Sequence, residues 1–134
     1  MALLTSQEIE IALKPCMVTL DQIVEQVLAG DSLAVRSLVQ DFLEAFPNLT
    51  LVPRPALAGS QPLAIAAALM EMFSERRSQM PPTWTREIGP APEAFYLVKA
   101  AATMPRLRRL CEQAGPEPLR RRRLYAPPDY LVFA

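Results

Sequence analysis

The stretch TLDQIVEQVLAGDSLAVRSLVQDFLEAF, residues 19–46, decides the fold of this chain. Thr19 and Gln22 form the capping-box pattern that starts a helix. Apolar side chains then recur at the spacing of one helix face, at Leu20, Ile23, Val24, Val27 and Leu28. This spacing predicts an amphipathic helix that ends at Gly30.

The second half of the stretch repeats the pattern. Asp31 caps a helix predicted over residues 32–46, and Pro47 ends it. Its apolar face consists of Val35, Leu38, Val39, Phe42, Leu43 and Phe46. Because only Gly30 and Asp31 separate the two helices, we expect an antiparallel or steeply angled helical hairpin.

The segments that flank the hairpin carry weaker signals. Residues 6–14 fit a short helix capped by Ser6, but alternating Ile and Glu would equally suit a strand. Residues 48–55 are expected to be extended, with a brief β segment at Leu49 and Leu51. A third helix is predicted with Ser60 as its cap and Pro62 in its first turn. Its inner stripe would contain Ile65, Ala66, Leu69, Met70 and Phe73.

The C-terminal half is richer in proline, of which the whole chain has 14. We expect little regular structure over residues 80–93, a helix over 94–102, and another helix from Pro105 to a stop at Gly115. Leu107, Leu110, Cys111 and Ala114 would form one face of this last helix. Residues 116–134 read as irregular or partly extended. The sequence therefore predicts a mainly all-α fold: a single compact helical domain over 1–134, with a proline-rich irregular C-terminal segment and minor β structure.

Composition limits the classes of protein. Hydrophobic residues make up 51% of the 134 residues, which is typical of a globular domain. The longest apolar run, residues 62–70, is too short to span a bilayer, and the N-terminus lacks the basic region of a secretory signal. Cys16 and Cys111 form no CxxC pair, so both are expected to be reduced, buried side chains. We therefore expect a cytoplasmic protein without a membrane partner.

The chain lacks the residues that several kinds of catalytic and metal chemistry usually require. The chain has no histidine, which removes the commonest general base and the commonest zinc ligand. Its four glycines are isolated, so no glycine-rich phosphate loop is present. We expect no catalytic residues, no metal site and no cofactor, and the sequence gives no support for an enzyme.

A cluster of arginines provides the most distinctive candidate binding residues. The net charge of zero hides an uneven distribution: residues 1–72 carry three bases and eight acids, whereas residues 73–134 carry eleven and six. The candidate cluster contains Arg106, Arg108, Arg109, Arg120, Arg121, Arg122 and Arg123. Arginine suits bidentate recognition of carboxylate or phosphate. The cluster can bind a partner protein, bind nucleic acid, or pair internally with acids of the N-terminal half.

Aromatic residues add candidate anchors. Tyr125 and Tyr130 could stack on bases, and Trp84 is either a cap on the domain's own core or an interface anchor. The apolar end of the chain, residues 129–133, docks on the core or inserts into a partner through Phe133.

The C-terminal half also resembles a family of short uncharacterised bacterial proteins. The resemblance rests on Pro82-Thr-Trp84-Thr85, Leu107-Arg-Arg-Leu110, Pro118-Leu-Arg-Arg-Arg-Arg-Leu124 and Asp129-Tyr-Leu131. Similar proteins are encoded beside nucleotidyltransferase-like or other toxin-type partners, so the resemblance implies an antitoxin-like role.

Our leading hypothesis is a non-enzymatic protein-interaction module, an antitoxin-like neutralising partner of a toxin-type enzyme. Its partner would present an acidic surface to the arginines and anchors named above, and a homo-oligomer of this chain stays open as well. The alternative is an RNA- or DNA-binding module that uses the same arginines. The isoelectric point near 6.3 argues against this alternative, because basic nucleic-acid-binding domains commonly exceed about 9.

Overall fold

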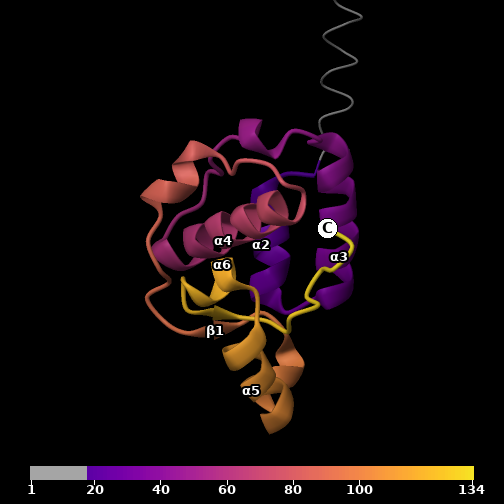
Figure 1. Cartoon of the computed structure of the whole chain (residues 1–134), viewed down its shortest axis with the longest axis vertical. Coiled ribbons are helices and arrows are strands. Elements are labelled where there is room, and N and C mark those ends of the chain that lie inside the picture. Colours follow the sequence, from indigo (N-terminus) through magenta and orange to yellow (C-terminus); the bar gives the residue numbers. More distant parts are fainter. Residues whose placement is uncertain (1–17) are drawn as a thin grey trace, which may run out of the picture.

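The structure, a computed structural model, describes residues 18–134. The segment predicted as a helix or strand over residues 6–14, and Cys16, lie outside the described residues. In Figure 1 the helices form a compact body, from which two neighbouring helical segments within residues 99–114 extend. The prediction of a mainly helical fold is confirmed.

The predicted helical hairpin forms the first part of this body. Helix α2 spans Leu20–Ala29 and helix α3 spans Ser32–Ala45. The backbone N–H of Thr19 donates to Gln22 Oε1 at 3.2 Å, and Asp31 Oδ1 accepts from the N–H of Ala34 at 3.0 Å. Gly30 links the helices in the left-handed conformation, with φ of 76°. The two helices pack side by side (Figure 1).

Helix α4, Ser60–Arg76, is the centre of the domain. The sequence predicts one buried stripe, but an unbroken run from Ala64 to Met70 is fully buried. Short alanine side chains allow neighbouring elements to approach this helix from several directions. The predicted cap is wrong by one residue, because Gly59 occupies the cap position and Ser60 is already helical.

Two 3₁₀ helices cover this centre. The first, η2, spans Leu49–Leu51, where the sequence predicted a brief β segment. That prediction is wrong because Asn48 Oδ1 accepts from the N–H of Thr50 at 3.2 Å and curls the backbone into a turn. The second, η3, spans Thr83–Glu87 within the proline-rich stretch.

The helix predicted over residues 94–102 is also wrong. Strand β1, Phe95–Tyr96, pairs in parallel with strand β2, Leu124–Tyr125, and the 3₁₀ helix η4 follows at Lys99–Ala102. The N–H of Leu97 donates to the carbonyl of Tyr125 at 2.9 Å, which extends the pairing. Backbone hydrogen bonds to a distant segment therefore override the local helical preference.

The chain ends with two helices and a docked tail. Helix α5 spans Pro105–Ala114, as predicted, and helix α6 spans Glu117–Arg120. The tail packs on the domain's own core through Tyr130, Leu131 and Phe133. None of the helices in residues 18–134 combines the length and apolar character needed to cross a lipid bilayer.

Candidate functional site

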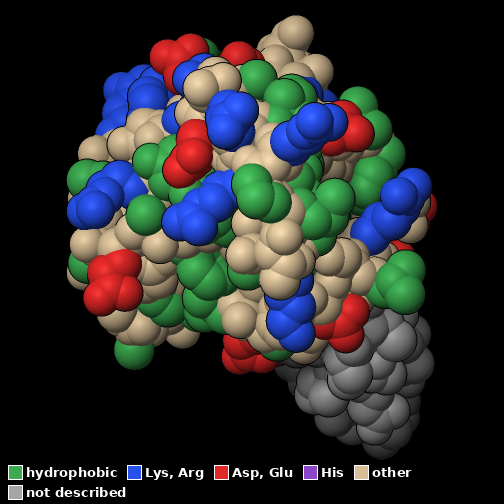
Figure 2. Space-filling view, turned by 90° about the horizontal axis from the view of Figure 1, so that it is seen from below, with side chains coloured by type: hydrophobic (Ala, Val, Ile, Leu, Met, Phe, Trp, Pro, Cys, Tyr) green, Lys and Arg blue, Asp and Glu red, His purple; other side chains and the backbone are tan. Residues whose placement is uncertain are grey.

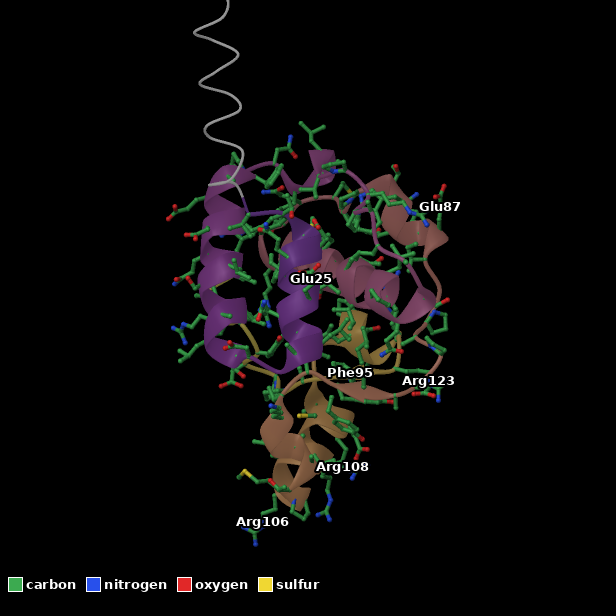
Figure 3. All side chains as sticks on the ribbon, turned by 180° about the vertical axis from the view of Figure 1, so that it is seen from behind. Glu25, Glu87, Phe95, Arg106, Arg108 and Arg123 are labelled. Carbon is green, nitrogen blue, oxygen red and sulfur yellow. The ribbon has the colours of Figure 1, made fainter. Side chains whose placement is uncertain are left out.

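Helix α5 extends away from the body of the domain. Figures 1 and 3 show it beyond β1, with Arg106 at its far end. Cys111 is its one buried residue, and Leu107 is half-buried. Leu110, predicted on the inner face, is instead 44% exposed. The helix is thus joined to the body along one narrow side, and most of its surface faces solvent.

Tyr96 of β1 fastens α5 to the body. Its hydroxyl donates to Glu112 Oε2 at 2.5 Å and accepts from Arg108 Nε at 3.3 Å. The Arg108 guanidinium also lies 5.0 Å from the centre of the Tyr96 ring. Arg108 and Glu112 are four residues apart and so share one helix face. The hydrogen bond to Glu112 raises the pKa of Tyr96.

The C-terminal end of α5 is fixed by a close backbone approach. A Cβ atom at Gly115 would lie 2.5 Å from the carbonyl oxygens of Ala126 and Cys111. No L side chain fits there, so glycine lets the helix end lie against the segment after β2. Together with Tyr96, this contact holds α5 in a defined direction.

The opposite face of α5 carries the exposed part of the arginine cluster. Arg106, Arg109, Leu110 and Gln113 are all exposed and follow the spacing of a single helix face. We call these four residues the α5 basic surface. Within residues 18–134, neither Arg106 nor Arg109 makes a side-chain hydrogen bond or ion pair. Met104, 53% exposed, adds apolar area at the start of the helix.

Arg122 has a different environment. Its side chain is buried, and its guanidinium donates to Glu71 of α4. The second terminal nitrogen donates to the carbonyls of Thr85 at 2.9 Å and Ile88 at 3.2 Å. Arg122 therefore joins α4 to η3 and has no surface to offer a partner. Here an acid of the N-terminal half does pair with an arginine of the C-terminal half.

The other three residues of the run are exposed, and each makes an intrachain contact. Arg120 donates to the carbonyl of Gly115 at 2.7 Å, and Arg123 donates to that of Pro92 at 3.1 Å. Arg121 lies 3.4 Å from Glu71. Their guanidinium groups remain open to solvent, but their backbone belongs to α6 and the turn after it rather than to an extended segment.

The predicted aromatic anchors are dispersed. Trp84 packs on the core near η2, and its indole N–H donates to the carbonyl of Val52 at 2.9 Å. The ring of Tyr125 lies 5.2 Å from that of Tyr96. Phe133 lies under the guanidinium of Arg36, with 5.2 Å between that group and the ring centre. The structure therefore does not bring these side chains together with the α5 basic surface.

Tyr130 is also part of the body. Arg76 donates to the carbonyls of Tyr130 and Leu131 at 2.7 and 2.8 Å, which ties the tail to α4. Burial raises the pKa of Tyr130.

Two residues that position the site were missed by sequence reasoning. Tyr96 and Glu112 hold α5 in place, but neither belongs to a recognisable motif. The run Phe95-Tyr-Leu-Val98, rich in aromatic and β-branched residues, was the available signal for a strand. The hydrogen bond between the Tyr96 hydroxyl and Glu112 depends on tertiary packing, so no sequence pattern could predict it.

No protein-family model matches the chain, and no curated protein or solved structure is significantly similar to it. In residues 18–134, no group of three or more Cys, Asp or Glu side chains is placed to hold a metal ion.

Proposed function

We propose that this protein is an interaction module that binds a protein partner with an acidic surface through the α5 basic surface. One observation carries the proposal. Arg106 and Arg109 lie together with Leu110 on one exposed face of a projecting helix, and neither arginine forms an ion pair with an acid among the described residues. Arginines that stabilise the fold, such as Arg122, are engaged within the chain, whereas these two are not.

The composition of the surface suits a protein partner. Arginine is enriched among the residues that dominate binding energy, and it pairs with carboxylates through two parallel hydrogen bonds. Leu110 lies beside the arginines on the same exposed helix face and supplies apolar area that a partner can cover. A fixed helix also loses little conformational entropy on binding.

Nucleic acid is the less well supported partner. Figure 2 shows basic side chains separated by hydrophobic ones, without a continuous basic strip across that face. The rings of Tyr96 and Tyr125 pack on each other, so each has one face already covered. A nucleic-acid groove normally combines a continuous positive track with free aromatic faces.

The nature of the partner is a finer proposal. The Leu107-Arg-Arg-Leu110 part of the antitoxin-like resemblance falls on α5, and it contributes two members of the α5 basic surface, Arg109 and Leu110. A toxin-type enzyme with an acidic groove would fit this surface. Co-expression with a toxin-type enzyme encoded beside this chain should then relieve its toxicity, and α5 variants should fail to relieve it.

Co-purification of the native complex tests the general proposal. The double variant Arg106→Glu/Arg109→Glu should lose the partner, because both charges are reversed. The matched control is Arg77→Glu/Arg86→Glu, which reverses two exposed arginines outside α5. Capture that is equal for both variants would contradict the proposal. So would salt-sensitive retention of RNA or DNA that depends on Arg106 and Arg109.

A further inference from the structure

A notch lies where α5 joins the body of the domain. It has a volume of about 340 Å³ and is formed by the C-terminal end of α2, the segment from β1 to η4, and Arg108 of α5. Figure 3 labels Phe95 at the lower edge of the body and Arg108 farther out along α5. The residues lining this notch include no aspartate or glutamate.

The floor of the notch is apolar. Val27, Leu97 and Ala101 are buried there, and Leu28 contributes a side chain that is 41% exposed. A volume of this size lies at the lower end of the range for ligand pockets, and it suits an inserted side chain. Covering Leu28 would remove apolar area from water, which favours an apolar occupant.

Two cations border this floor. A Cβ atom at Gly30 would lie 2.8 Å from Cε of Lys99, so the aliphatic chain of Lys99 rests directly on the end of α2. Gly30 is favoured here by its left-handed φ, whereas the flexible Lys99 side chain could shift to admit a Cβ atom. Arg108 is held on the Tyr96 ring at the other side. Arg108 is thus positioned by Tyr96, while Lys99 is exposed beside the end of α2.

We infer that this notch receives an acidic, apolar segment of the protein partner: a large apolar side chain inserts against Leu28, and a neighbouring carboxylate pairs with Lys99 or Arg108. The inference rests on the proposed function, because Arg108 and the α5 basic surface belong to the same short helix. The floor is apolar and bordered by cations, and none of its lining residues is an acid, which is complementary to this chemistry.

Selection from a displayed library of short random peptides tests the inference on the full chain. The enriched peptides should combine Leu, Ile or Phe with nearby Asp or Glu. They should bind Leu28→Glu and Lys99→Glu at least about tenfold more weakly than the wild type. The matched controls are Leu51→Glu and Arg86→Glu, which change an exposed leucine and an exposed arginine elsewhere. In NMR spectra, bound peptide should shift the amide signals of residues 27–30 and 95–102.

Three results would overturn the inference: no enrichment, enriched peptides without acids, or equal binding to the notch variants and controls. Its failure is distinguishable from that of the proposed function. If the partner requires Arg106 and Arg109 but binds the Leu28→Glu variant normally, only the inference about the notch is refuted. If peptides occupy the notch but the partner binds the Arg106→Glu/Arg109→Glu variant normally, only the proposal about the α5 basic surface is refuted.

Discussion

Replacing Arg122 by methionine should lower the free energy of unfolding by about 3–5 kcal/mol, the cost of breaking a buried ion pair from one side. Methionine keeps much of the apolar stem but removes the guanidinium. That group joins Glu71 of α4 to the carbonyls of Thr85 and Ile88 at the end of η3. The substitution therefore separates two elements that lie far apart in the sequence.

The magnitude follows from burial. The side chains of Arg122 and Glu71 are 9% and 15% exposed, so water can replace the lost hydrogen bonds only in part. Each buried carbonyl left without a donor costs about 1–3 kcal/mol, and an uncompensated carboxylate costs more. Arg121, 3.4 Å from Glu71, remains to offset part of this loss. In a domain of this size the melting temperature should fall by roughly 10–20 °C.

Urea unfolding provides the assay, with the fluorescence of Trp84, adjacent to Thr85, as the signal. The matched control is Arg121→Met, whose side chain is 56% exposed and whose loss should cost less than about 1 kcal/mol. Equal effects of the two substitutions would refute the reasoning. So would a loss below about 1 kcal/mol for Arg122→Met.

Three further predictions concern the supports of α5 and of the tail. Gly115→Ala should cost about 1–3 kcal/mol in urea unfolding, because the new methyl group would overlap two carbonyl oxygens. Tyr96→Phe removes the hydroxyl shared by two α5 side chains, so the amides of α5 should exchange hydrogen faster while those of α4 stay unchanged. Tyr130 has a pKa raised above its ordinary value of 10.0, so the unfolded chain ionises first and stability should fall as the pH rises above that value. Tyr130→Phe should reduce this fall, which urea midpoints between about pH 9 and pH 11 would measure.

Local patterns predicted the hairpin and both ends of α5. Thr19, Gly30 and Asp31 act on residues within a few positions, so their effects can be read along the chain. The periodicity of α4 predicted a buried stripe, yet its alanines are buried as well. That burial depends on which elements approach the helix, and a single sequence does not specify it.

Distant pairing explains the error over residues 94–102. Phe95 and Tyr96 form a strand because the backbone of Leu124 and Tyr125 is available beside them. For the same reason, the sequence alone did not predict which arginines are buried and which are exposed. Arg122 is buried and Arg106 is exposed, although both belong to dense runs of arginine. The guanidinium of Arg122 is surrounded by Glu71, Thr85 and Ile88. Arg106 lies on α5, which projects from the body, so its side chain is exposed to solvent.

The central claim is that the α5 basic surface binds an acidic protein partner and is dispensable for folding. The most direct test is a calorimetric titration of the co-purified partner into wild type, Arg106→Glu/Arg109→Glu, and the control Arg77→Glu/Arg86→Glu. We predict that the α5 variant loses affinity by about 100-fold or more, with its melting temperature unchanged, while the control binds like the wild type. Undiminished affinity of the α5 variant would contradict the claim.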